Sequence, residues 1–176
     1  MATIEEYASG RLLPAVKEVL SMLTSSDESL EGSPAGKALL EKFGPGDPTL
    51  VTANEAGQAI RASTRCAVGE RGCLKLLPRA AFSETIFLDD LADAMVEAGK
   101  AKMVTREEAA ATLQRYVRNP KVLSNVSGKP LKLCCTSPDT CLYWNLEKRG
   151  LACIRRAGAT HPDEATRSPH PSACDT

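Results

Sequence analysis

Residues 121–146 read KVLSNVSGKPLKLCCTSPDTCLYWNL, and this stretch contains a predicted hairpin, three cysteines and a helix start. Two short apolar runs, at 122–124 and 131–133, flank an SGKP turn, which is typical of two paired strands. The second run leads directly into two adjacent cysteines. A Ser-Pro-Asp sequence then predicts a new helix that has a third cysteine in its first turn.

Outside this stretch the sequence indicates mostly helices. Capping boxes, in which Glu follows Thr after three residues, are predicted at Thr3, Thr52 and Thr105. Apolar spacing predicts a helical segment over 4–24 that Gly10 and Pro14 split. Further helices are predicted at 34–43, 53–63, 84–98 and 106–117. We therefore expect a mainly helical α+β domain with one small β-hairpin.

The chain of 176 residues is expected to form one domain, followed by a tail. Its parts are an N-terminal helical region at 1–50, a cysteine-containing region of the same domain at 51–156, and a proline-rich tail at 157–176 that we expect to be disordered. No apolar run approaches the ~20 residues that span a bilayer, and the N-terminus is acidic rather than signal-like. We therefore expect a cytoplasmic protein with no membrane partner.

Six of the seven cysteines fall into two groups, which are Cys66 and Cys73, and Cys134, Cys135, Cys141 and Cys153. With only two histidines in the chain, grouped thiols favour zinc or an iron–sulfur cluster, because both prefer thiolate ligands. An odd number of cysteines in a cytoplasmic chain makes a disulfide framework a poor explanation. We expect four of these six residues to bind the cofactor, and the sequence leaves open which four.

The spacing of the cysteines favours one [4Fe–4S] cluster, with zinc as the alternative. Neither the C-x-x-C knuckles of zinc ribbons nor those of ferredoxins are present. Residues 105–156 contain ten basic and four acidic residues, so cations would surround a negatively charged cluster and could attract an acidic redox partner. The alternative interpretation of these charges is an ordinary solvated surface.

The sequence GKAKMVTREEAA at 99–110, continuing to VLSNVS at 122–127 and to the adjacent cysteines, resembles a group of small [4Fe–4S] proteins from anaerobic microbes. The resemblance covers about residues 60–155. It implies cluster ligation by Cys66 or Cys73 together with Cys134, Cys135 and Cys141. The dense downstream run of cysteines of that group is missing here. Locally, CTSPDTCLYWNLEKRG from Cys135 is similar to the cluster-binding helix of Wbl-type redox regulators.

These features predict an iron–sulfur protein that acts in electron transfer or as an accessory redox subunit, with a redox protein or a larger enzyme complex as partner. No catalytic motif indicates a stand-alone enzyme. One alternative is a redox-sensing transcription regulator, because helices 84–98 and 106–117 with the hairpin outline a winged helix, although acidic residues begin the second helix. The other is a zinc-stapled interaction module. Asp89, Asp90 and Asp93 are interpreted as a solvated helix face.

Overall fold

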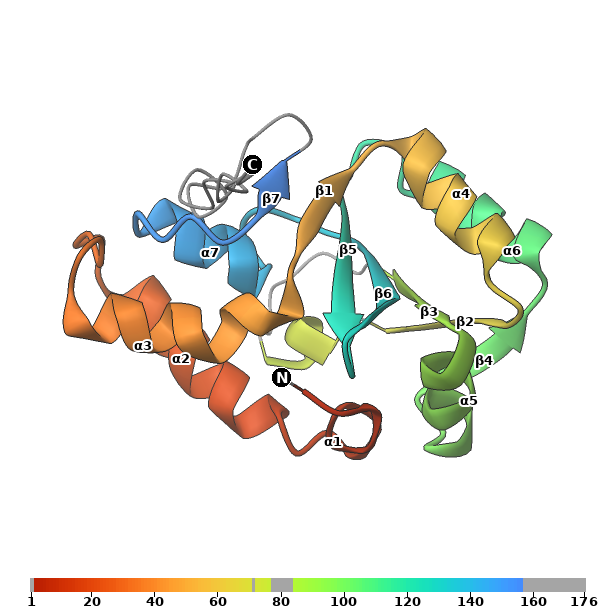
Figure 1. Cartoon of the computed structure of the whole chain (residues 1–176), viewed down its shortest axis with the longest axis horizontal. Coiled ribbons are helices and arrows are strands. Elements are labelled where there is room, and N and C mark those ends of the chain that lie inside the picture. Colours follow the sequence, from red (N-terminus) through yellow and green to blue (C-terminus); the bar gives the residue numbers. More distant parts are fainter. Residues whose placement is uncertain (1, 71, 77–83, 157–176) are drawn as a thin grey trace, which may run out of the picture.

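The structure is a computed structural model that describes residues 2–70, 72–76 and 84–156. These residues form seven α-helices, two short 3-10 turns and one seven-stranded sheet (Figure 1). The helices are α1 (Ile4–Ser9), α2 (Leu13–Ser25), α3 (Pro34–Phe43), α4 (Ala53–Ala62), α5 (Asp89–Glu97), α6 (Arg106–Arg115) and α7 (Leu142–Lys148), and the 3-10 turns are η1 (Gly44–Gly46) and η2 (Gly72–Leu76). The strands are β1 (Thr49–Val51), β2 (Cys66–Glu70), β3 (Glu84–Leu88), β4 (Ala101–Val104), β5 (Lys121–Val126), β6 (Lys129–Cys135) and β7 (Arg155–Arg156).

The β5–β6 hairpin lies in the middle of the sheet, whose strand order is β4-β2-β3-β6-β5-β1-β7. Neighbouring strands are antiparallel except for β1 and β7, which are parallel. At the hairpin turn, Ser127 and Gly128 have φ values of 51° and 77°. Positive φ at both central residues matches the turn twist to the strand twist. The predicted hairpin is confirmed, and its strands extend beyond the predicted runs.

The prediction of a mainly helical domain with a single hairpin is wrong, because the described residues form a mixed α/β fold. The segment predicted as one helix over 84–98 is strand β3 followed by helix α5. β3 pairs with β2 on one side and β6 on the other, and residues 85–88 are all buried. A short apolar run that is buried on both faces has no periodicity that distinguishes a strand from a helix.

The two cysteines of the first group lie in different elements. Cys66 begins strand β2, where it pairs with Leu88 and Val104, and Cys73 lies in η2. Strand β4 separates α5 from α6, so the two helices of the expected winged-helix outline do not follow each other directly. The disorder predicted for 157–176 lies outside the described residues.

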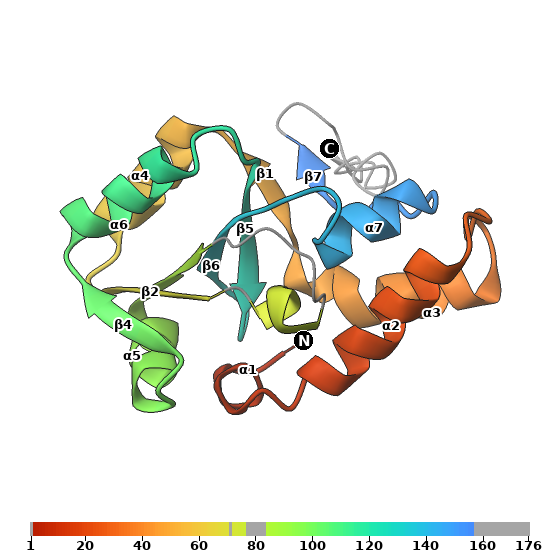
Figure 2. The same cartoon turned by 180° about the vertical axis from the view of Figure 1, so that it is seen from behind.

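Helices cover both faces of the sheet. On one face α4 and α6 lie side by side, as Figures 1 and 2 show, and contact Ile86 and Leu133. On the other face α1 and α5 pack against Ala67 and Phe87. Successive side chains of a strand point to opposite faces, so Ile86 and Phe87, although adjacent, belong to different cores.

A third apolar cluster joins α2, α3 and α7 at the end of the molecule away from α4 and α6 (Figure 1). The nearly buried guanidinium of Arg149, after α7, donates hydrogen bonds to the carbonyl oxygens of Leu23, Ser26 and Glu28, where α2 ends. These bonds satisfy carbonyl groups that have no partner within the helix. In the described residues, no helix has the length and apolar character needed to cross a membrane.

The predicted break in the first helical segment is confirmed. α1 ends at Gly10, which has a φ of 82°, and α2 then begins with Pro14 in its first turn. The hydrogen bonds that attach the separate α1 to the rest of the fold include Ser127 N to Ala2 O at 2.9 Å and Ile4 N to Ser127 Oγ at 3.0 Å. This attachment holds α1 against the face of the sheet on which Lys132 of β6 lies.

Candidate functional site

The structure separates the cysteines that the sequence suggested as ligands. Cys66 and Cys135 are buried together between the sheet and the α4–α6 face. Cys134 is on the opposite face, where it lines a pocket with Cys73 and Cys141. Adjacent residues of a strand face opposite sides, so Cys134 and Cys135 do not reach one common site.

The two cysteines closest to α7 differ in their surroundings. Cys141 precedes α7 as its N-cap residue rather than lying in its first turn. The Cys153 thiol donates a hydrogen bond to the carbonyl oxygen of Tyr143 at 3.5 Å. Burial, reinforced by the charge of Glu147, raises the pKa of Cys153 to about 12. Among the described residues, no three His, Cys, Asp or Glu side chains are grouped to hold a metal ion. Metal or cluster binding stays a prediction.

The pocket that contains three of these thiols has a volume of about 350 Å³. This volume is at the lower end of the roughly 300–1,000 Å³ typical of small-molecule sites. Strands β3, β5 and β6 form its floor, and α1, α2, η1, η2 and α7 contribute its walls. In Figure 1 these wall segments lie below and to the left of the hairpin. Apolar side chains in the lining include Leu13, Val16, Phe43, Phe87, Met95 and Val126.

Three residues in a row across neighbouring strands form the centre of the floor, and two of them, Lys132 and Ser124, are polar. Phe87 of β3 pairs with Lys132 of β6, and Lys132 pairs with Ser124 of β5. In the next row, Cys134 lies beside Thr85, with 3.4 Å between its sulfur and the threonine hydroxyl oxygen. Directly opposed residues have Cβ atoms about 4.5–5.5 Å apart. The Lys132 and Ser124 side chains therefore leave the sheet next to each other and line the same pocket.

The half-buried Lys132 side chain ends between two aromatic rings. Its Nζ atom lies 4.9 Å from the ring centre of Tyr7 and 5.9 Å from that of Tyr143. Aromatic faces attract a cation, and this attraction strengthens when water is removed. In the part of the chain that the structure describes, no carboxylate forms an ion pair with Lys132, and no oxygen accepts a hydrogen bond from its ammonium.

The pKa values of Lys132 and of both tyrosines are raised in the pocket. Burial alone lowers the pKa of Lys132, but interactions with Tyr7, Tyr143, Cys134 and Cys73 outweigh burial and raise that pKa well above its usual range. Burial also raises the pKa of both tyrosines, which disfavours the phenolate forms. At neutral pH the pocket therefore contains a positive charge beside two neutral hydroxyl groups.

Ser124 is the second unusual residue of the floor. Its side chain is 1 % exposed, and within the described residues its Oγ is the one buried side-chain nitrogen or oxygen without a hydrogen-bond partner. A buried hydroxyl without a partner costs about 1–3 kcal/mol. Ser124 is also in the lining of the pocket, so a bound molecule could provide the missing partner.

No match was found among protein-family models, curated proteins or solved structures. The interpretation of the site therefore depends on its geometry. Sequence reasoning missed Tyr7, Ser124 and Lys132 as site residues, although Lys132 alternates with the apolar Leu131 and Leu133 in the predicted strand. That alternation is ordinary for a strand with one solvated face. Only the packing of α1, α2 and α7 around the pocket shows that the Lys132 face is covered.

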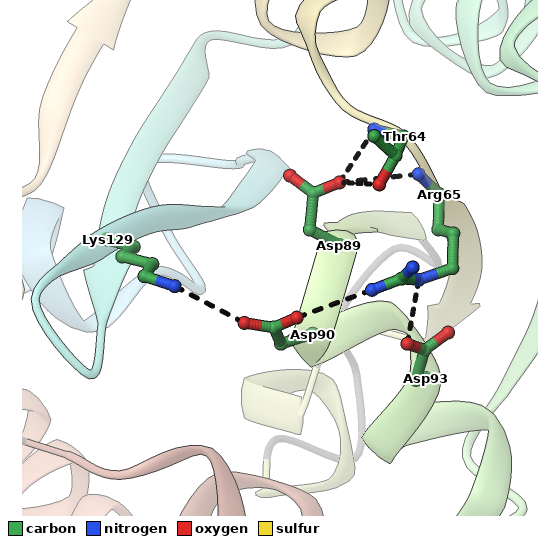
Figure 3. Close-up of polar contacts among 6 residues, drawn as sticks. All are labelled: Thr64, Arg65, Asp89, Asp90, Asp93 and Lys129. Atoms are coloured by element: carbon green, nitrogen blue, oxygen red, sulfur yellow. Dashed lines mark hydrogen bonds and ion pairs between the residues drawn. The ribbon is translucent and has the colours of Figure 1, made fainter.

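The acidic residues at the start of α5, interpreted as a solvated face, take part in polar contacts (Figure 3). The Arg65 guanidinium pairs with Asp90 at 3.3 Å and with Asp93 at 2.7 Å. Lys129, at the hairpin turn, reaches Asp90 at 3.4 Å. These contacts join β2, α5 and β6 on the surface. Because Asp90 and Asp93 already pair with basic side chains, the cluster is best explained as structural.

Proposed function

We propose that this chain binds a small organic anion with an apolar body in the pocket around Lys132. The observation that supports this function is a charged ammonium in a largely apolar pocket, with no carboxylate partner among the described residues. Removing a charge from water is costly, and buried charges are normally paired. An anionic ligand would supply the opposite charge, and the apolar walls would hold the rest of the molecule.

Two other charged groups of the lining, Glu6 and Lys100, have partners of their own. The Glu6 carboxylate accepts hydrogen bonds from the backbone and side chain of Thr3 in the cap of α1. The ammonium of Lys100 donates to the carbonyl oxygen of Ala8 at 2.5 Å. Lys132 is therefore the group around which we expect the ligand to be oriented.

Titration calorimetry at pH 7 with octanoate, octanol and octylamine tests this function. We expect octanoate to bind the wild-type protein at least ~10-fold more tightly than either neutral or cationic analogue, because a hydrogen bond to a charged group contributes about 1.5–3 kcal/mol. The Lys132→Met variant should bind octanoate and octanol equally, since it keeps the apolar stem and removes the charge.

Lys148→Met is the matched control, because Lys148 is exposed on α7 and pairs with Asp139 outside the pocket lining. Its octanoate affinity should equal that of the wild type. Two results would overturn the proposed function. One is equal affinity of the wild-type protein for octanoate and octanol, and the other is no binding of any straight-chain acid from butanoate to dodecanoate.

The iron–sulfur protein predicted from the sequence is the second candidate function, with an electron-transfer or accessory redox role. It is supported by the position of Cys73, Cys134 and Cys141, three soft-metal ligands, in the lining of one pocket. Anaerobic purification tests it. A brown protein with absorption near ~400 nm and about four irons per chain would support the cluster. A colourless protein with one zinc would support the zinc-stapled module instead.

Substitutions divide the predicted ligands further. If a cluster forms in the pocket, Cys134→Ala and Cys141→Ala should lose iron. Cys66→Ala and Cys135→Ala should retain it, because those two thiols are buried on the other face of the sheet. If wild-type protein contains no iron after anaerobic purification and chemical reconstitution, the iron–sulfur function is wrong. The redox-sensing transcription regulator is then wrong as well.

A further inference from the structure

Ser124 and Lys132 are paired polar residues on the floor of a pocket whose lining is largely apolar. The cross-strand pair of Ser124 and Lys132 lies on a face where the neighbours of Ser124 along β5 are Val122 and Val126. Valine at position 124 would continue this apolar face without leaving a buried hydroxyl. Serine instead places a polar atom, Ser124 Oγ, on the residue that pairs with Lys132.

We infer that Ser124 and Lys132 together bind one carboxylate group, so that the ligands of this pocket are monocarboxylic acids with an apolar chain or ring. This inference rests on the proposed function, and it adds the chemical class of the acidic group. A carboxylate has two oxygens that accept hydrogen bonds, and the ammonium and the hydroxyl are two donors on paired residues of neighbouring strands. One oxygen would face Lys132 and the other would face Ser124.

The local backbone supports a specific orientation for Ser124. The regular register of β5 and β6 shifts immediately after it, between Ser124 and Asn125. A β-bulge or irregularity of this kind changes the direction of the neighbouring side chains, and bulges often occur next to active sites. The hydroxyl at this position has no backbone or side-chain acceptor in the described residues, so it is available to donate to a ligand.

The charge balance distinguishes a carboxylate from a phosphate. Lys132 offsets about one negative charge, whereas a phosphate monoester has a charge of about −1.5 to −2 at pH 7. The excess negative charge would lie in an apolar pocket that also contains the Glu6 carboxylate. Lys42, a further cation of the lining, lies on the exposed surface above the ring of Phe43. A singly charged head group therefore fits this pocket best.

Calorimetry with octanoate and octyl phosphate, on the wild-type protein and on Ser124→Ala and Ser124→Thr, tests the inference. Wild-type protein should prefer octanoate to octyl phosphate by at least ~10-fold, because the second charge is not offset. Ser124→Ala should weaken octanoate binding about 5- to 10-fold, the loss of one hydrogen bond. Ser124→Thr keeps the hydroxyl and should stay within about 3-fold of the wild type.

A thermal melt without ligand separates binding from a structural role. Ser124→Ala removes a hydroxyl that has no partner, so its melting temperature should equal or exceed that of the wild type. A lower melting temperature with unchanged octanoate affinity would overturn the inference. The inference would also be overturned if the wild-type protein bound octyl phosphate as tightly as octanoate or more tightly. This comparison requires no variant.

The outcomes also distinguish this inference from the proposed function. If Lys132→Met weakens octanoate binding while Ser124→Ala does not, the anion site stands and the role of Ser124 is wrong. If octanoate binds equally well to the wild type and to Lys132→Met, both proposals are wrong. If both variants weaken octanoate binding and octanol binding stays unchanged in both, the two residues bind the acidic group together.

Discussion

Arg149, Lys121 and Lys132 are basic side chains with little solvent exposure, and their different partners give them different roles. Arg149 donates to three carbonyl oxygens at the end of α2, and Lys121 donates to three carbonyl oxygens in the segment after α6. The Lys132 ammonium lies near two aromatic rings, and among the described residues no carboxylate or carbonyl oxygen is its partner. The first two cations complete the backbone of the fold, and the third is available to a ligand.

Replacement of Arg149 should be among the most destabilising single changes. Arg149→Ala leaves carbonyl oxygens at the end of α2 without their charged donor, so we expect the free energy of unfolding to fall by about 3 kcal/mol. Urea denaturation measures this loss. Arg118 is exposed, and Arg118→Ala should change stability by less than about 0.5 kcal/mol. Equal effects of the two substitutions would contradict the capping role of Arg149.

Asp89 determines how the surface network responds to acid. Its Oδ1 accepts hydrogen bonds from the backbone N–H of Thr64 at 2.7 Å, from the Thr64 hydroxyl at 2.8 Å and from the backbone N–H of Arg65 at 3.3 Å (Figure 3). Burial raises the pKa of Asp89, but these hydrogen bonds outweigh burial, and the net pKa is lowered from 3.8. The stabilisation is therefore complete well above pH 3.8 and is lost as the pH falls through the lower folded-state pKa.

The Asp89→Asn variant tests this pH dependence. Asn adopts the positive φ of 48° found at this position as readily as Asp, so the variant removes the charge with little backbone strain. At pH 6 we expect it to be about 1 kcal/mol less stable than the wild type. In urea denaturation from pH 7 to pH 2.5, this difference should shrink below about pH 4. A stability difference that stays constant from pH 7 to pH 2.5 would contradict the role of the carboxylate. The same pH-dependent difference for Asp27→Asn, at an exposed position, would also contradict it.

At the scale of the element, alternation along β6 assigns its residues to two sites. Leu133 and Cys135 complete the core beneath α4 and α6, whereas Lys132 and Cys134 line the pocket. The chain therefore places a core thiol and a pocket thiol at consecutive positions. Sequence spacing groups these two cysteines together, and strand geometry separates them.

The reactivity of the thiols should follow this alternation. With N-ethylmaleimide under native conditions, we expect Cys134 to be alkylated at least ~10-fold faster than Cys135, because a reagent reaches a pocket more readily than a core. Saturating octanoate should slow the reaction of Cys134 and leave Cys66 unchanged. Tandem mass spectrometry of the modified peptides measures each rate. Equal rates for Cys134 and Cys135 in the folded protein would show that the assigned faces are wrong.

At the scale of the whole molecule, the pocket is assembled from segments that are distant in the sequence. Tyr7 comes from α1, Lys132 from β6 and Tyr143 from α7, and each packs in a different part of the apolar interior. The Tyr7 ring also meets Phe87 edge-on, with 6.2 Å between the ring centres. A ligand in this pocket would contact several of the segments that must come together during folding.

Ligand binding should therefore stabilise the whole fold. Octanoate at 100 times its Kd should raise the free energy of unfolding by about 2.7 kcal/mol, because it binds only the folded state. For a chain of this size this corresponds to an increase in Tm of roughly 5–10 °C. Calorimetric melts measure the shift, and at the same octanoate concentration Lys132→Met should show a much smaller one. An equal shift in both proteins would mean that octanoate binds elsewhere.

The sequence by itself determined the local features of this protein. The capping boxes at Thr3, Thr52 and Thr105 are confirmed, as are the helix break at Gly10 and the central hairpin. Each depends on hydrogen bonds or dihedral angles within a few residues, so the residues that decide it are neighbours in the chain.

Only the tertiary structure decided the strands β2, β3 and β4 and the position of the pocket. Residues 84–88 form a strand because β2 and β6 lie beside them, and both partners are distant in sequence. The roles of Lys132 and Ser124 likewise depend on which strands pair and which helices cover that face. Burial and charge pairing depend on the distances between residues in the folded structure. The order of residues along the chain does not give these distances directly, because they are set only when the strands pair.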